Sequence, residues 1–169
     1  NEKTFLDLFA GTNLVSEFFK KDYEILTNDI LYFSYVNSKA IIENNNKLTF
    51  DKLPFNPFEF LNDDKNMKSY NGSDYYTKNY TPIGDAMYLT VENGRRIDFI
   101  RNTIEEWNEQ GYLESNEYYY LLSSLVESIP YVSNITGTYG AFLKHWDKRA
   151  LKKLEIKPLP VLNLSLIHI

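Results

Sequence analysis

The sequence predicts an α/β fold in which the start of an open parallel sheet is followed by a largely helical insertion. Apolar runs and amphipathic stretches alternate through the first 45 residues in the order strand, helix, strand, helix. That order implies two parallel strands joined by a crossover helix. Beyond it, the long periodic segments repeat apolar residues at helical spacing. A chain of 169 residues has room for one domain with such an insertion.

The first expected strand covers residues 3–9 and reads as a buried strand, with apolar positions at Phe5, Leu6, Leu8 and Phe9. A small-residue loop follows. It leads into an expected helix at 13–21 with one apolar face, formed by Leu14, Val15, Phe18 and Phe19. The second strand is expected at 23–29, ending in an acid, and the second helix at 30–45. Because two strands are too few for a stable sheet, we expect the others outside this chain or in weakly patterned segments.

The rest of the chain is expected to be mostly helical. Prolines with Asn and Asp clusters favour loops and short helices at 46–91. Long helices are expected at 92–111, with Gly111 as C-cap, and at 115–129, with Ser115 as N-cap and Pro130 as the stop. The last segments are expected to be a turn or short extended piece at 137–143, a short basic helix or loop at 144–154, and the beginning of another strand from 155.

Both ends of the chain lead us to expect a fragment. The chain begins one or two residues before a core strand and has no initiator Met. The final residues, NLSLIHI, end in an apolar run that fits no earlier pattern. We therefore expect a non-native junction near residue 162.

Composition excludes several classes of function. Cysteine is absent, which excludes disulfides, thiol nucleophiles and thiolate zinc sites. The two histidines, His145 and His168, lack metal-ligand spacing, so we expect no metal site. The net charge of −5 argues against a protein that is basic all over, but it allows a local basic face. No apolar stretch reaches the roughly 18 residues of a membrane span and no signal peptide opens the chain, so a cytoplasmic protein is expected.

The loop in FLDLFAGTN, residues 5–13, raises the question of a cofactor. Its single glycine, Gly11, does not match the three-glycine fingerprint of dinucleotide sites, and no Lys-Ser or Lys-Thr follows as in phosphate-binding NTPase loops. Asp29 follows Gly11 at close to the spacing of about 20 residues at which such folds place a ribose-binding carboxylate. Asp7 could face the ammonium of an amino-acid moiety, so S-adenosylmethionine fits. The residues also allow a structural reading, in which Asp7 bonds loop amides and Asp29 caps the second helix.

A family resemblance adds to this reading. FLDLFAGTN, followed by ILTNDILYFSYV, resembles the start of the Dam-like, D12-class N6-adenine-specific DNA methyltransferases. The cofactor motif of that family, Asp-x-Phe-x-Gly-x-Gly, is matched at Asp7, Phe9 and Gly11, and its second strand commonly ends in Asn-Asp, as at 28–29. Collinear similarity to restriction-modification members continues to about residue 160, through GDAMYLTVENGRRIDFIRNTIEEW, NEYYYLLSSLVESI and NITGTYGAFLK.

The resemblance implies a partial Rossmann-like, S-adenosylmethionine-dependent methyltransferase fold with a largely helical insertion. Residues 1–45 would begin the methyltransferase domain, 46–155 would be a target-recognition insertion, and 156–169 would start a further strand with a non-native tail. The implied cofactor is S-adenosyl-L-methionine, bound by Asp7, Phe9, Gly11, Thr12 and Asp29. The implied reaction is methyl transfer to the N6 amine of adenine in double-stranded DNA. A cognate restriction endonuclease is a further candidate partner.

Two departures from the family pattern matter. Asn13 stands where the motif has its last glycine. Asn tolerates a left-handed backbone, but its side chain could crowd the cofactor or bond to it. The family's catalytic Asp-Pro-Pro-Tyr motif is absent, and both partial matches, NPF at 56–58 and IPY at 129–131, are interpreted as decoys. We therefore predict no catalytic residue in this chain and expect it to be inactive by itself.

The insertion holds the candidate DNA contacts. A local positive cluster, suited to phosphate contact or equally to a solvated helix face, is formed by Lys144, Lys148, Arg149, Lys152 and Lys153. Tyr139 lies between two glycines, in either a DNA contact or a tight fold corner. The arginines at 95, 96 and 101 are interpreted as members of surface ion pairs. Two alternatives to a DNA methyltransferase stay open: a non-catalytic DNA- or protein-binding module, and a methyltransferase that acts on RNA or a small molecule.

Overall fold

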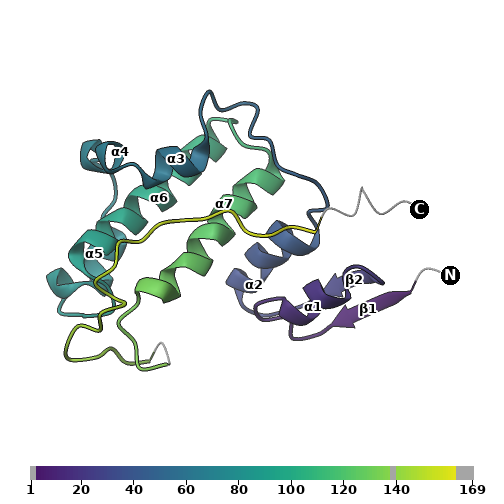
Figure 1. Cartoon of the computed structure of the whole chain (residues 1–169), viewed down its shortest axis with the longest axis horizontal. Helices are drawn as coiled ribbons and strands as arrows, with labels where there is room; N and C mark the ends of the chain where they lie inside the picture. Colours follow the sequence, from purple (N-terminus) through teal and green to yellow (C-terminus); the bar gives the residue numbers. More distant parts are fainter. Residues whose placement is uncertain (1–2, 138–139, 163–169) are drawn as a thin grey trace.

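The computed structural model describes residues 3–137 and 140–162 (Figure 1). A small α/β unit comes first, a helical part follows, and the two meet where α2 packs against α7. The α/β unit consists of β1 (Thr4–Asp7), α1 (Leu14–Phe19), β2 (Glu24–Thr27), α2 (Tyr32–Asn37) and the π-helical turn η1 (Ser38–Ile42). The helical part consists of α3 (Pro57–Asn62), α4 (Asp64–Ser69), α5 (Tyr75–Tyr80), η2 (Pro82–Gly84), α6 (Val91–Glu109), α7 (Ser115–Ser128) and η3 (Ile129–Val132).

The two strands pair in parallel, with Thr4 opposite Glu24 and Asp7 opposite Thr27. Since α1 connects them and α2 follows, the predicted strand–helix–strand–helix order is confirmed. Backbone bonds extend the pairing past the strand ends, from Asn28 N to Asp7 O at 2.8 Å and from Ala10 N to Asn28 O at 3.0 Å. These bonds bring together the two loops that follow the strands.

The prediction of a buried first strand is wrong for the described residues. Phe5 faces α1, where its ring stacks on Phe19 with centroids 4.6 Å apart. The other side of the strand is exposed, as is most of the apolar face predicted for α1; the exposed side chains are Leu6, Leu8, Phe9, Leu14, Val15 and Phe18. Alternate residues of a strand point to opposite faces, and a single helix covers only one face of so narrow a sheet.

The helix α2 continues directly into η1 and joins the α/β unit to the helical part. Val36, Ala40 and Ile42 are its buried apolar residues. Asn37 accepts a hydrogen bond from the Ser123 hydroxyl at 2.7 Å and donates one to Glu127 at 3.0 Å, both residues of α7. Because these partners lie far apart in sequence, the polar contact fixes α2 on α7 specifically.

The centre of the helical part is the pair α6 and α7. Ile97, Ile100 and Ile104 of α6 are fully buried, as is Leu121 of α7. Both predicted long helices are confirmed, with small differences at their ends. Gly111, at φ 75°, lies one residue beyond the observed C-cap Gln110. The N-cap of α7 is Glu114 rather than Ser115, because Glu114 and Glu117 form a reciprocal capping box.

The segment after residue 133 folds around one buried amide rather than into regular elements. Asn134 Nδ2 donates to the carbonyls of Met87, Leu143 and His145, and its Oδ1 accepts from Asp147 N, at 3.0–3.1 Å. Turns replace a helix at 144–154, so only the loop alternative of that prediction survives. No strand is assigned over 155–162, where Asn62 instead bonds both backbone groups of Ile156. Within the described ranges, no helix is long and apolar enough to cross a membrane.

Candidate cofactor site

The loop after β1 meets the loop after β2 through Asp29. Its Oδ2 accepts a hydrogen bond from Gly11 N at 2.9 Å, and its Oδ1 accepts one from Leu31 N at 2.8 Å. Backbone N–H groups of Leu31 and Gly11 therefore lower the pKa of the Asp29 carboxyl and keep it ionised. The prediction that Asp29 caps the second helix is wrong, because the N-cap of α2 is Leu31 and no side chain caps that helix. The bond from Leu31 N instead closes a turn in the loop before α2. Both bonds leave the cofactor reading open, since each carboxylate oxygen has a second lone pair.

The second acid of the site, Asp7, lies at the end of β1. Its Oδ2 accepts a hydrogen bond from the hydroxyl of Ser16 at 2.7 Å, so its partner is a helix side chain rather than a loop amide. Ser16 is fully buried under the loop. Asp7 and Asp29 consequently lie at the carboxyl ends of neighbouring parallel strands, the edge at which open α/β sheets bind ligands.

The surface around Gly11 is open to a ligand. Gly11 has a φ of 53°, and the nearest atom to an added Cβ would be the Phe9 carbonyl oxygen at 4.0 Å. Phe9 and Ile30 are 89% and 97% exposed beside the Gly11–Asp29 bond. Thr12 is exposed and lines a cavity of about 320 Å³ with Asn37 and residues of α7. An approachable backbone, two acids and exposed apolar side chains together fit a nucleoside that carries an amino-acid group.

Asn13 does not crowd this surface. Its side chain is fully buried and turned away from the loop face, toward α2. The amide donates to Ser34 O at 3.0 Å and accepts from the Ser38 hydroxyl at 2.7 Å. Sequence reasoning missed these serines and Ser16; small polar residues within apolar helices were the available signal.

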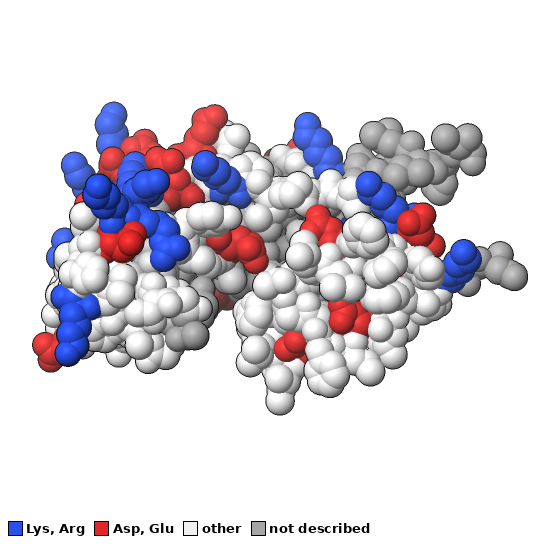
Figure 2. Space-filling model, turned by 60° about the horizontal axis from the view of Figure 1, so that its bottom comes forward, with Lys and Arg blue, Asp and Glu red and all other residues white. Residues whose placement is uncertain are grey.

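The predicted DNA contacts lie on the helical part. Lys144, Lys148, Arg149 and Lys152 are all exposed, and the ion pairs seen in the described residues include none of them. Arg149 donates a hydrogen bond to Ser133 O at 3.3 Å. Lys153, the fifth member of the predicted cluster, instead pairs with Asp64 at 2.8 Å. Figure 2 shows Lys and Arg side chains gathered with some acids on the helical part, at its left, while the α/β unit at its right presents a mostly uncharged surface. Tyr139 lies outside the described residues.

The three arginines of α6 fit the prediction of surface ion pairs only in part. Arg95 is exposed, but the ion pairs seen in the described residues do not include it. Arg101 forms the expected surface pair with Glu105 at 3.3 Å. Arg96, by contrast, is fully buried, and its guanidinium pairs with Asp64. Arg96 and Lys153 lower the pKa of Asp64 to about 2, with the hydrogen bond from Lys153 as the largest cause. The prediction of a surface pair is therefore wrong for Arg96, whose guanidinium is buried against Asn62 O at the end of α3 and Asp64 at the start of α4.

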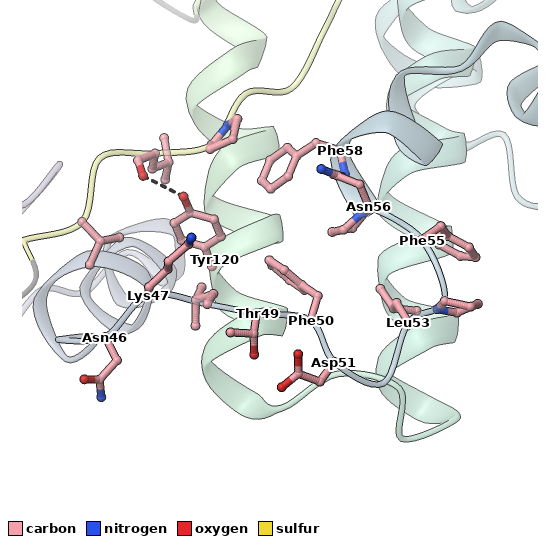
Figure 3. Close-up of a pocket in the computed structure, with 16 residues that line it drawn as sticks. Asn46, Lys47, Thr49, Phe50, Asp51, Leu53, Phe55, Asn56, Phe58 and Tyr120 are labelled. Carbon is pink, nitrogen blue, oxygen red and sulfur yellow. Dashed lines mark hydrogen bonds between the residues drawn. The ribbon is translucent and has the colours of Figure 1, made fainter.

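The two partial catalytic motifs have structural roles. Asn56 of NPF caps α3, its Oδ1 accepting from Phe58 N at 2.9 Å. This segment lines a cavity of about 890 Å³, which Figure 3 shows between residues 46–58 and Tyr120, whose hydroxyl donates to Leu159 O at 2.7 Å. The IPY segment lies in η3. Among the described residues, no cluster of acidic or histidine side chains could hold a metal ion.

Comparison with known proteins identifies relatives. The chain matches the D12 class N6 adenine-specific DNA methyltransferase family over residues 1–169. It is 50% identical to Modification methylase StsI of Streptococcus sanguinis over 98% of this chain and 26% of that protein. It is 48% identical to Type II methyltransferase M.FokI of Planomicrobium okeanokoites over 94% of this chain and 25% of that protein. Type II methyltransferase M.NlaIII of Neisseria lactamica is 35% identical, over 94% and 46%.

These relatives are longer than the chain, which spans about a quarter of the length of the first two. No solved structure matches it.

Proposed function

Because the chain belongs to the D12 class N6 adenine-specific DNA methyltransferases, we propose that it supplies the cofactor loop and target-recognition region of such an enzyme. The whole enzyme transfers a methyl group from S-adenosylmethionine to the exocyclic amine of adenine in double-stranded DNA. The observation that carries the proposal is the bond between Gly11 and Asp29 in the loops after the two parallel strands, with Asp7 at the end of the first strand.

The cofactor's ribose hydroxyls would donate to the free lone pairs of Asp29, whose lowered pKa keeps it an acceptor. The ammonium of the methionine end would pair with Asp7. Gly11 allows the ligand to approach the backbone, and Phe9 with Ile30 offers apolar surface to the adenine. Thr12, which is exposed beside Gly11, is the fifth proposed cofactor-binding residue. When bound, the cofactor supplies the electrophilic methyl group.

The exposed apolar side of β1 supports a Rossmann-like sheet of more than two strands. In a chain of the length seen in the relatives, further strands would pair with the edges of this sheet, and a helix packed on its open face would cover Leu6 and Leu8. The catalytic Asp-Pro-Pro-Tyr motif, absent from the 169 residues, would come from the same source. We therefore expect the 169-residue chain alone to transfer no tritiated methyl groups to adenine-containing DNA.

The helical insertion would hold the DNA. The exposed side chains of Lys144, Lys148 and Lys152, and the guanidinium nitrogens of Arg149 other than the one that donates to Ser133 O, would contact phosphates, which position a duplex without reading its sequence. Tyr139 remains a proposed contact on the same segment. Because the target amine is inaccessible within a duplex, the adenine must be flipped out toward the cofactor. We also propose a cognate restriction endonuclease as partner and action in the cytoplasm; the relatives are named as a modification methylase and a type II methyltransferase.

Isothermal titration with S-adenosylmethionine tests the cofactor site. The chain should bind it, and Asp29→Asn should weaken binding about tenfold or more, because the amide nitrogen cannot accept a ribose hydroxyl. Asp22→Asn is the matched control, an exposed acid in the turn before β2. Failure of the unsubstituted chain to bind would refute the cofactor proposal, and DNA binding without cofactor binding would favour a non-catalytic module.

A further inference from the structure

Asn13 adopts the backbone conformation that the missing glycine would have supplied. Its φ of 65° and ψ of 15° are left-handed, a region that Asn enters more readily than most residues. Its side chain, however, is fully buried. The position thus keeps the turn of the cofactor loop and adds a polar group beneath it.

That polar group is bonded on both of its atoms. Nδ2 donates to Ser34 O at 3.0 Å and reaches back to Gly11 O at 3.5 Å. Oδ1 accepts from the Ser38 hydroxyl at 2.7 Å, and Ser38 in turn accepts from the Thr27 hydroxyl at 3.1 Å. A continuous chain of hydrogen bonds therefore runs from the end of β2, through the helix, to the loop.

Asn13 bonds the helix formed by α2 and η1 at the point where its hydrogen-bond pattern changes. Ser38 is the first residue of η1, at which α-helical bonding gives way to π-helical bonding. The backbone N–H of Ser38 also donates to Ser34 O, the same carbonyl that Asn13 uses. Such π-turns are found frequently at functional sites. Asn13 thus ties the loop to an irregular point of the helix.

We propose that Asn13 is a positioning residue for the cofactor, and this rests on the proposed function of the loop. Asp29 holds the loop from its outer side through Gly11 N, and Asn13 holds it from beneath through Ser34 and Ser38. A loop held on both sides is already ordered before the ligand arrives. Less ordering entropy is then lost on binding, so the cofactor binds more tightly.

The substitution Asn13→Gly separates this role from backbone conformation. Glycine accepts a φ of 65° without strain, so only the side chain and its bonds are lost. Loss of these bonds leaves Ser38 without its acceptor beneath the loop. We expect the dissociation constant of S-adenosylmethionine to rise about tenfold. A crowding side chain would give the opposite result, tighter binding.

The experiment measures S-adenosylmethionine binding by calorimetry, together with thermal unfolding. The variants are Asn13→Gly, Ser38→Ala and the double substitution. The two single effects on affinity should be non-additive, because each removes the same bond. Asn93→Ala is the control: Asn93 is also buried and bonds Lys152 O at 2.9 Å and Leu154 N at 2.9 Å, within the helical part. It should lower the melting temperature and leave the cofactor affinity unchanged.

The outcomes separate the two proposals. No binding by the unsubstituted chain overturns the cofactor site and this inference together. Binding that is unchanged or tighter in Asn13→Gly overturns only the positioning role. A lower melting temperature with unchanged affinity assigns Asn13 a structural role and likewise overturns it. If Asn13→Gly does not fold, Ser38→Ala alone decides, since it removes one hydroxyl and must still weaken binding.

Discussion

Replacing Asp98 tests how the helical part is held together. Asp98 lies on α6 and is 1% exposed, yet its charge is compensated entirely by α5. One oxygen accepts from Tyr76 N at 2.8 Å, and the other accepts from Thr77 N at 2.9 Å and from the Thr77 hydroxyl at 2.7 Å. Asp98 therefore caps a helix distant in sequence and docks it on α6.

The magnitude follows from those three bonds. A hydrogen bond to a charged group contributes about 1.5–3 kcal/mol, and water can partly replace the bond to Tyr76 N, which is not fully buried. We expect Asp98→Ala to lower the free energy of unfolding by about 3 kcal/mol. Asp98→Asn keeps the shape and one acceptor oxygen but turns an N–H₂ toward backbone donors, so a loss of about 2 kcal/mol is expected.

Urea unfolding followed by circular dichroism measures both losses, provided that the slope against urea is unchanged. The control is Glu109→Ala, an exposed acid at the end of the same helix, with an expected change within about 0.5 kcal/mol. A loss below about 1 kcal/mol for Asp98→Ala would refute the reasoning. It would mean that α5 is held by its apolar contacts alone.

Two further predictions concern pH and DNA. Burial, with Glu105 nearby, raises the pKa of Tyr118 to about 12. The folded chain then holds a proton that the unfolded chain loses near pH 10, so the free energy of unfolding should fall as the pH rises from about 10 to 12. The fall should be less steep in Tyr118→Phe, and parallel plots of unfolding free energy against pH for the two proteins would contradict this. Replacing both Lys148 and Arg149 with Ala should weaken DNA binding to all sequences alike and reduce the slope of log affinity against log salt by about 1.8, as measured by fluorescence anisotropy. Lys65→Ala, an exposed lysine on α4, should change neither quantity, and an unchanged slope in the double variant would exclude phosphate contact by this pair.

The sequence predicted elements whose signals are local. The apolar repeats of α6 and α7 identified both helices, and the order of the first 45 residues identified the parallel strands. The approach of Gly11 to Asp29 was also predictable, because parallel strands end at one edge of a sheet. These features can be predicted without knowing which residues, distant in sequence, pack against them.

What escaped prediction depends on such partners. Arg96 and Asp98 appear among the charged residues of α6, but α4 and α5, from an irregular stretch of sequence, bury them. Asn134 gave no signal of its role, since its four partners come from residues 87–147. Burial of Leu6 was predicted wrongly, because burial depends on what covers a strand rather than on the strand itself. The sequence shows Asn13 only as a departure from the last glycine of the family motif. The position of α2 shows what its amide contacts.

The most direct test of the central claim, that the loop of residues 9–13 binds S-adenosylmethionine, is photo-crosslinking. The chain would be irradiated with methyl-labelled cofactor, digested, and the labelled peptide identified by mass spectrometry, with excess unlabelled cofactor as competitor. If the loop binds the cofactor, label that unlabelled cofactor displaces should appear in the peptides around Phe9 and Ile30 and should be lost in Asp29→Asn. Label confined to the helical part, or label that excess cofactor does not displace, would contradict it.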